Sequence, residues 1–226
     1  YVDTMALPDG NTALLMGDVA GHGLGAAAFV FTARALLRSG LAEGRDPRDV
    51  VTRANRFLCR DMAEGRFMTL FLGVHDPEKG ELSFLNAGHT PPLVVEPGSL
   101  RELERTSVPL GVLDSARYDK LVTVPLSAGA TFFAYTDGVV EARNPEGDLF
   151  GKERLLSLLR VCLNDSPQEL LGKARAAILD FVADEVASDD LTLLAYRPLS
   201  PGTETQRESS DRAEAASTRT AARGPA

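Results

Sequence analysis

The change of hydrophobic period along the chain constrains its fold more than any other feature. A short apolar run at 11–18 is followed by two segments whose apolar residues recur at helical spacing. From 67 to 137 the pattern changes to short β-rich runs separated by turns. Helical spacing returns at 151–160 and 167–186, and a last apolar run occupies 190–197. This order predicts an α+β domain in which helices cover antiparallel sheets.

The predicted helices have recognisable ends and one apolar face. Residues 24–38 are good helix formers, and Ser39-Gly40 predicts a helix stop. A second helix follows Asp46-Pro47, and its apolar residues form one stripe: Val50, Ala54, Phe57, Leu58 and Met62. The helix at 167–186 also has an apolar face, formed by Leu170, Ala174, Ile178, Phe181 and Val182.

Composition and charge exclude several classes of protein. The 226 residues, 44% of them hydrophobic, suffice for one large domain. A formal net charge of −8 argues against binding to nucleic acid or to an anionic membrane. No run approaches the roughly 18 apolar residues of a membrane span, and no signal peptide opens the chain. We therefore expect a cytoplasmic protein without a nucleic-acid partner or a membrane span.

The two ends of the chain differ in character. The sequence begins at Tyr1 without a methionine, so we expect an N-terminally truncated domain over 1–197 of a longer protein. Residues 198–226 are predicted to form a disordered polar tail, because almost no large apolar side chain is present there to offset the entropy of ordering. Cys59 and Cys162 lie inside predicted helices without a CxxC motif, and are expected to be buried free thiols.

Three aspartates stand at the ends of predicted strands far apart in the sequence: Asp18, Asp137 and Asp189. A carboxylate at a strand end is held on rigid backbone, as a metal ligand needs to be. If the strands are neighbours, the carboxylates repel one another, and divalent cations would relieve that repulsion. Mg²⁺ or Mn²⁺ suits such an all-oxygen ligand set. Each aspartate also has a plainer interpretation as a turn or cap residue, and spacing alone does not choose between the two.

Several segments resemble, in order, the motifs of the bacterial SpoIIE/RsbU-like branch of the PPM (phosphatase 2C type) metal-dependent phosphatases. They include GDVAGHG, FMTLFLGVHDPEKGELSFLNAGHTPPLVV, FFAYTDGVVEARNPEGDLFGKERLLSLL and DDLTLLAYRP, and the resemblance extends from residue 1 to about 197. It implies a four-layer α-β-β-α sandwich with two antiparallel β-sheets flanked by helices. It also implies hydrolysis of phosphoserine or phosphothreonine in proteins by a water activated by two ions, Mn²⁺ or Mg²⁺.

The same resemblance implies roles for individual residues. Asp18 would bridge both ions, and the carbonyl of Val19 would bind one of them. Asp137 and Asp189 would bind the other ion. Asp190 remains an alternative to Asp189, because either acid of the Asp-Asp pair could serve as the ligand.

Gly21 and His22 are expected to line this site. In the eukaryotic branch a histidine considered as a proton donor stands two positions after the bridging aspartate, but here Ala20 occupies that position, so the role does not transfer. His22 could still protonate the leaving oxygen, or it could bond locally and only shape the turn. Gly21 and Gly23 permit a positive φ in the backbone around the site.

Four further polar residues are considered for a role in the site or in the structure. Three of them have both interpretations, and one has a structural interpretation alone. Asn86 and His89 could line the cleft or form a hydrogen-bonded corner between strands. Arg143 could hold the substrate phosphate or form a surface salt bridge. His75 is expected on the surface of a strand.

The resemblance also implies partners. The substrate would be a phosphorylated STAS-type anti-anti-sigma factor, and a sensor or receiver module would precede this domain in the full-length protein. Family members usually carry a metal-supporting acid just before the segment that matches the start of this sequence. The alternative is therefore a low-activity pseudophosphatase that acts as a signalling binding module.

Overall fold

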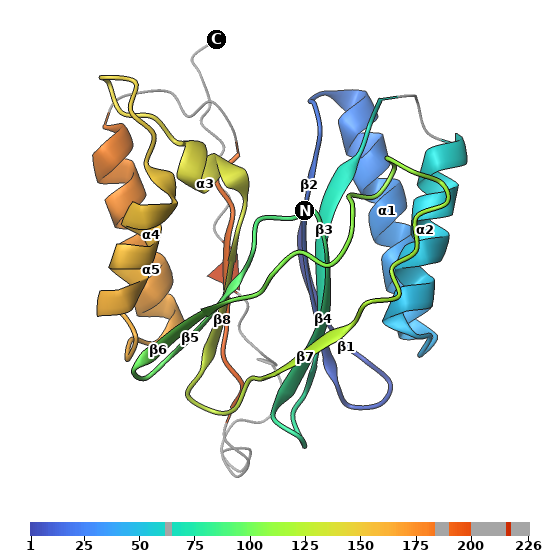
Figure 1. Ribbon diagram of the computed structural model, residues 1–226, viewed down its shortest axis with the longest axis horizontal. Coiled ribbons are helices and arrows are strands. Elements are labelled where there is room, and N and C mark those ends of the chain that lie inside the picture. Colours follow the sequence, from blue (N-terminus) through green and yellow to red (C-terminus); the bar gives the residue numbers. More distant parts are fainter. Residues whose placement is uncertain (62–64, 184–189, 200–215, 218–226) are drawn as a thin grey trace. The chain divides into compact units, whose positions relative to one another are not determined.

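The computed structural model describes residues 1–61, 65–183, 190–199 and 216–217 (Figure 1). The chain divides into two compact units, which we call unit 1 and unit 2. Unit 1 comprises 1–91 and 104–125, and unit 2 comprises 92–103 and 126–226. Each unit has its own antiparallel sheet and its own helices.

Unit 1 is a five-stranded sheet with two helices along one face (Figure 1). The strands, in spatial order, are β1 (Val2–Ala6), β2 (Thr12–Val19), β3 (Met68–Asp76), β4 (Glu81–Ala87) and β7 (Val122–Pro125). The helices are α1 (Leu24–Ala42) and α2 (Pro47–Asp61).

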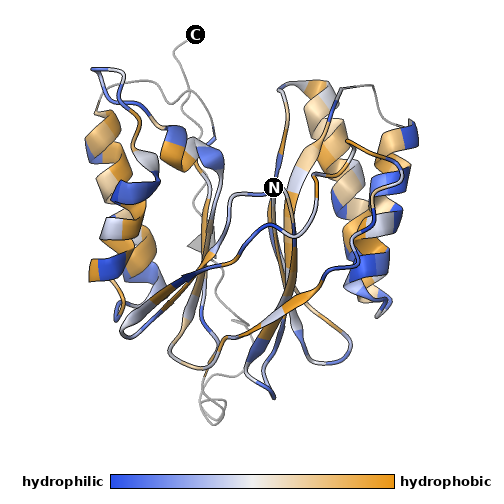
Figure 2. Cartoon of the chain, in the orientation of Figure 1, coloured by the Kyte–Doolittle hydropathy of each residue, from blue (hydrophilic) through white to orange (hydrophobic). Residues whose placement is uncertain are grey.

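The core of unit 1 lies between this sheet and its helices. Leu15 of β2 packs in one cluster with Phe29 and Leu37 of α1, all fully buried. Leu14 and Met16, which alternate with Leu15 along the strand, are also buried, so both faces of β2 are apolar. In Figure 2, the orange of hydrophobic residues extends along the strands of this sheet and over parts of its two helices.

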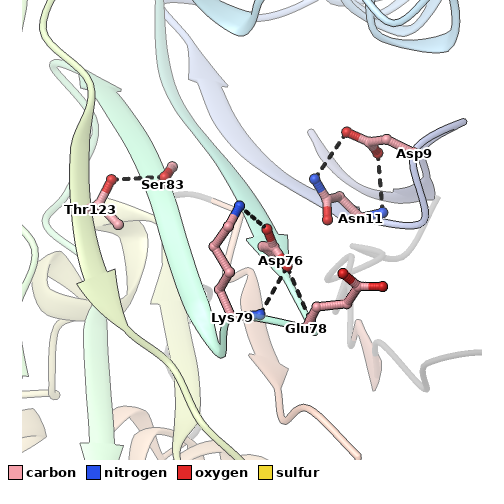
Figure 3. Close-up of polar contacts among 7 residues, drawn as sticks. All are labelled: Asp9, Asn11, Asp76, Glu78, Lys79, Ser83 and Thr123. Carbon is pink, nitrogen blue, oxygen red and sulfur yellow. Dashed lines mark hydrogen bonds and ion pairs between the residues drawn. The ribbon is translucent and has the colours of Figure 1, made fainter.

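The end of this sheet at which β1 connects to β2 and β3 connects to β4 carries tight, polar turns (Figure 3). Asp76 accepts hydrogen bonds from the backbone N–H groups of Glu78 and Lys79, both at 3.0 Å, and closes the β3–β4 hairpin. Asp9 accepts from the backbone and the side chain of Asn11 between β1 and β2. Residues 77–80 therefore form the turn of a hairpin between β3 and β4.

Unit 2 is a second five-stranded antiparallel sheet with three helices. The strands, in spatial order, are β10 (Ala216–Ser217), β9 (Leu193–Tyr196), β8 (Thr131–Tyr135), β5 (Leu93–Glu96) and β6 (Ser99–Glu102). The helices are α3 (Asp137–Glu141), α4 (Gly151–Val161) and α5 (Pro167–Val182), and α4 and α5 lie beside the sheet in Figure 1. Two antiparallel sheets with flanking helices confirm the predicted α+β class.

Helix α1 differs from its predicted end. It continues through Ser39 and Gly40 to Ala42, so the predicted stop is wrong. A Cβ atom at Gly40 would lie 2.7 Å from Cγ2 of Val50, so this glycine lets α1 and α2 approach closely and does not end the helix.

Helix α1 is also long and apolar enough to cross a membrane by length and composition alone. The prediction from continuous apolar runs did not identify this helix as a candidate membrane span. Its buried side chains, however, belong to the core of unit 1.

Two side chains are placed differently from the sequence prediction. Val50 and Leu58 of the predicted α2 stripe are buried, but Phe57 is 41% exposed, and Met62 lies outside the described residues. His75 is 1% exposed, so its predicted place on the strand surface is wrong. His75 lies on the same face of β3 as the fully buried Phe71, because alternate residues of a strand point to one face.

The structure describes both cysteines and a small part of the predicted tail. Cys59 is half-buried, Cys162 is buried, and both are free thiols; burial raises the pKa of Cys162 to about 11. Of the predicted disordered tail, the structure describes 198–199 and strand β10, which pairs antiparallel with β9. The rest lies outside the described residues, so its disorder stays a prediction.

Candidate active site

In unit 1, Asp18 is the next-to-last residue of β2 and lies within the ladder that β2 forms with β3. It lies opposite Thr69 in the register, and its Oδ1 accepts a hydrogen bond from the backbone N–H of Val19 at 3.0 Å. The ladder continues past Asp18, since the N–H of Ala20 donates to the carbonyl of Phe67 at 2.9 Å. The sheet therefore fixes the backbone on both sides of the Asp18 carboxylate.

A glycine-rich turn joins Asp18 to helix α1. Gly21 has φ +93° and Gly23 has φ +81°, which confirms the prediction that these positions need positive φ. His22 between them is exposed and makes no hydrogen bond with any other described residue. The two interpretations of His22 stay open, and the positive φ values of the turn belong to the glycines on either side of it.

Asn86 and His89 form the hydrogen-bonded corner that was one of their two interpretations. Both are buried, and Oδ1 of Asn86 accepts the N–H of His89 at 2.9 Å. The chain segment after β4 is held on Asn86 as well, because the N–H of Thr106 donates to its carbonyl at 2.8 Å. Nδ1 of His89 lies 2.9 Å from Oγ1 of Thr69, the residue opposite Asp18.

Arginines near the two aspartates have different surroundings. Arg143 is exposed and donates to the carbonyl of Gly147 at 2.9 Å, so both interpretations of its side chain stay predictions. Arg66, which the sequence analysis missed, lies against the glycine-rich turn. A Cβ atom at Gly25 would lie 2.6 Å from Nη2 of Arg66. No local pattern predicts this contact, since it depends on the pairing of β2 with β3.

In unit 2, Asp137 comes two residues after the end of β8 and begins α3. Its Oδ1 accepts the backbone N–H of Gly138 at 3.0 Å. The preceding Thr136 is buried, and its hydroxyl donates to the carbonyl of Asp190 at 3.0 Å and accepts the N–H of Thr192 at 3.1 Å. Thr136 thus ties the Asp137 strand end to the segment that contains Asp190.

The predicted ligands are described to different extents. Asp18 and Val19 lie in unit 1, Asp137 and Asp190 lie in unit 2, and Asp189 lies outside the described residues. Within the described part of the chain, no three metal-ligating side chains form one group. The donors that are present are carboxylate and carbonyl oxygens, which are the ligand types of Mg²⁺ and Mn²⁺. The chemistry of the donors fits these ions, while the complete ligand set stays a prediction.

Comparison with known families decides the relationship of this chain. The family model described as stage II sporulation protein E (SpoIIE) matches residues 8–198. The chain belongs to the SpoIIE family. The matched range includes both aspartate-bearing strand ends and the Asn86–His89 corner.

Two relatives of this SpoIIE-family chain illustrate the range of the family. Protein IcfG of Synechocystis sp. (strain ATCC 27184 / PCC 6803 / Kazusa) is 28% identical over 229 residues, covering 87% of this chain and 35% of IcfG. Phosphoserine phosphatase RsbU of Bacillus subtilis (strain 168) is 25% identical over 186 residues, covering 81% of this chain and 55% of RsbU. The chain thus spans about a third and about half of the length of these relatives.

The fold is shared with solved phosphatase domains. The SiaA-PP2C domain of Pseudomonas aeruginosa aligns with a TM-score of 0.77 at 23% identity, over 87% of this chain and 79% of that domain. At this identity the likeness concerns the fold alone. It agrees with the antiparallel sheets and flanking helices of the SpoIIE-family chain.

Proposed function

We propose that this SpoIIE-family domain is a metal-dependent protein phosphatase that hydrolyses phosphoserine or phosphothreonine in a protein substrate. The observation that carries the proposal is the placement of Asp18, next to last in buried β2, and of Asp137, two residues after buried β8. At each strand end a threonine hydroxyl forms a hydrogen bond that ties it to a segment distant in sequence. RsbU, named as a phosphoserine phosphatase, is a relative, which supports the same reaction class.

The proposed ligands divide between the two strand ends. Asp18 and the carbonyl of Val19 would hold divalent ions at the first strand end. Asp137 and Asp189 would hold them at the second, with Asp190 as the alternative acid. Gly21 and His22 lie on the same turn as Asp18 and are proposed to line the site. In such a site, divalent ions supply a water of lowered pKa and neutralise the charge that develops on the phosphoryl oxygens.

The residues of this chain supply position and charge. The ladder between β2 and β3 holds the backbone of Asp18. The backbone at this position is therefore already ordered before a ligand binds to the carboxylate. His22 is exposed on the glycine-rich turn that follows Asp18, and it is the candidate proton donor to the leaving serine oxygen.

The substrate and the cellular context follow from the same proposal. The substrate is a phosphorylated STAS-type anti-anti-sigma factor or a similar small regulator, and a sensor or receiver module regulates the domain in the full-length protein. The reaction takes place in the cytoplasm. These statements extend the family relationship, and each can be tested with the full-length protein.

The test is Mn²⁺-dependent hydrolysis of para-nitrophenyl phosphate and of a phosphoserine peptide by the full-length protein. Asp18→Asn and Asp137→Asn are expected to lower kcat by more than about 100-fold, since even changes behind the first ligand shell often cost 10- to 100-fold. Chelation by EDTA abolishes activity, and added Mn²⁺ or Mg²⁺ restores it.

Matched controls come from the same units. Asp9→Asn changes an exposed turn aspartate at the far end of the unit 1 sheet (Figure 3), and Asp180→Asn changes an exposed residue of α5. Both controls are expected to retain activity. Asp189→Asn and Asp190→Asn, made side by side, separate the two candidate acids. Activity that survives both Asp18→Asn and Asp137→Asn would disprove the metal assignment, and a wild-type protein without turnover would favour the pseudophosphatase.

A further inference from the structure

A chain of hydrogen bonds links a buried histidine to the backbone of Asp18 within unit 1. Thr69 lies opposite Asp18 on β3, and its Oγ1 accepts the N–H of Asp18 at 3.2 Å. The same oxygen lies 3.4 Å from the carbonyl of Asp18 and 2.9 Å from Nδ1 of His89. One hydroxyl group therefore contacts both polar groups of the Asp18 backbone and an imidazole from beyond β4.

The backbone of His89 is held on both sides and its side chain is buried. His89 is 1% exposed, its N–H donates to Oδ1 of Asn86, and its carbonyl accepts Nε of Arg105 at 3.0 Å. The preceding Gly88 has φ +74°, and a Cβ atom there would lie 2.5 Å from Cγ of Pro109. The corner therefore needs glycine at 88, and this tight corner brings His89 back toward β3.

The chemistry of a hydroxyl suits this position and that of an alkyl group does not. A hydroxyl has one proton and two acceptor lone pairs, so it can accept from Asp18 and share a hydrogen bond with His89 at the same time. Valine has nearly the same shape as threonine and can do neither. The contacts of Thr69 are therefore separable from its packing by a single substitution.

We infer that Thr69 and His89 are positioning residues that fix the peptide of Asp18, and through it the direction of the Asp18 carboxylate and of the Val19 carbonyl. This inference rests on the proposed function for its consequence, metal affinity, but its structural part is independent of turnover. Residues behind a ligand typically orient it and change metal affinity by 10- to 100-fold. The partners here act on the N–H and the carbonyl of Asp18, and that carbonyl belongs to the peptide that joins Asp18 to Val19.

The decisive variant is Thr69→Val, with Thr69→Ser as the conservative variant. In metal-free protein, amide hydrogen exchange at Asp18 and Val19 is expected to become about fivefold faster in Thr69→Val, because a hydrogen bond to the Asp18 amide is lost. The Kd for Mn²⁺, measured by titration calorimetry, is expected to rise about tenfold. Thr69→Ser is expected to restore both quantities.

The matched control is Thr123→Val in β7 of the same sheet. Thr123 also contacts another polar side chain through its hydroxyl, at 2.8 Å from Oγ of Ser83, but at the end of the sheet that carries the turns (Figure 3). This variant is expected to leave exchange at Asp18 and the Kd for Mn²⁺ unchanged. A thermal unfolding curve for each variant establishes that the fold is retained.

His89→Asn tests the second half of the pair. The double variant with Thr69→Val is expected to weaken Mn²⁺ binding no more than Thr69→Val alone, because the two residues act through one contact. Wild-type exchange at Asp18 in Thr69→Val, or additive effects in the double variant, would overturn the inference. If wild-type protein binds Mn²⁺ without hydrolysing phosphate esters, the proposed function fails while the exchange and binding measurements still decide the positioning role.

Discussion

The hydroxyl of Thr136 donates a hydrogen bond to the carbonyl of Asp190 at 3.0 Å, across 54 residues of sequence. The same hydroxyl accepts the N–H of Thr192, whose carbonyl in turn accepts the N–H of Thr136. In unit 1, the hydroxyl of Thr69 makes a comparable contact with Asp18. Each unit therefore uses one threonine to fasten a strand end that carries an aspartate to a segment distant in sequence.

Replacing Thr136 by valine is expected to loosen the segment at 190–192. The side chain is buried, and its loss leaves the N–H of Thr192 and the carbonyl of Asp190 without this partner, which costs about 1–3 kcal/mol of unfolding free energy. Urea unfolding measures that cost, and hydrogen exchange at Thr192 locates it. Thr136→Ser, which keeps the hydroxyl, should behave almost as wild type; an equal loss in Thr136→Ser would point to packing as the cause.

Two glycines near Asp18 should respond differently to alanine. A Cβ atom at Gly17 would lie 2.6 Å from the carbonyl oxygen of Thr69 and would also contact Cε of Met68, so backbone must move. At Gly25 the obstacle is the guanidinium of Arg66, which can rotate away. We expect Gly17→Ala to cost about 1–3 kcal/mol and Gly25→Ala less than about 1 kcal/mol, measured by urea unfolding. Equal costs would contradict the proposed difference between backbone and side-chain obstruction.

The buried Asn55 of α2 should be a strong stability determinant. Its Nδ2 donates to the carbonyl of Leu113, and its Oδ1 accepts the N–H of Gly111, both at 2.9 Å. Asn55→Ala removes both bonds and is expected to lower the free energy of unfolding by about 2–4 kcal/mol. The exposed ion pair of Arg60 with Asp114 provides the control, because Arg60→Ala should cost less than about 1 kcal/mol. A small effect of Asn55→Ala would show that the loop at 111–113 is held by other contacts.

The start of α5 should depend on pH through its capping box. Ser166 accepts the N–H of Glu169, and the Glu169 carboxylate accepts the N–H of Ser166. These bonds lower the pKa of Glu169, first through the backbone N–H and then through the hydroxyl of Ser166. A lowered folded-state pKa means that the stabilisation is present above the unfolded-state pKa of about 4.5 and is lost as the pH falls through the folded-state value.

Two variants test this capping box. Ser166→Ala is expected to cost about 1 kcal/mol at neutral pH, as for other caps of this type. The difference in unfolding free energy between wild type and Glu169→Ala is expected to shrink between about pH 7 and about pH 3. A difference that stays constant over this range would contradict the assignment of the stabilisation to the ionised carboxylate.

Local patterns in the sequence were enough to predict the four long helices and the aspartates near two strand ends, but not β1 or the short helix α3. The positions of β2 and β8, and of Asp18 and Asp137 near their ends, follow from alternation and turn residues that act over a few positions. The glycines at 21 and 23 were predictable for the same reason, because a sharp turn needs positive φ locally. Family motifs then assigned a chemistry to these positions.

Only the tertiary structure decided which residues stand opposite these aspartates. The pairing of Asp18 with Thr69 depends on the register between segments 51 residues apart, and no short-range pattern encodes that register. The same holds for Gly40, whose apparent stop signal is overridden by contact with Val50 of the neighbouring helix. Burial of His75 likewise depends on long-range packing, because alternation along a strand does not show which of its faces are covered. Local propensity sets the elements and the residues at their ends, whereas long-range packing sets the partners that hold those residues in place.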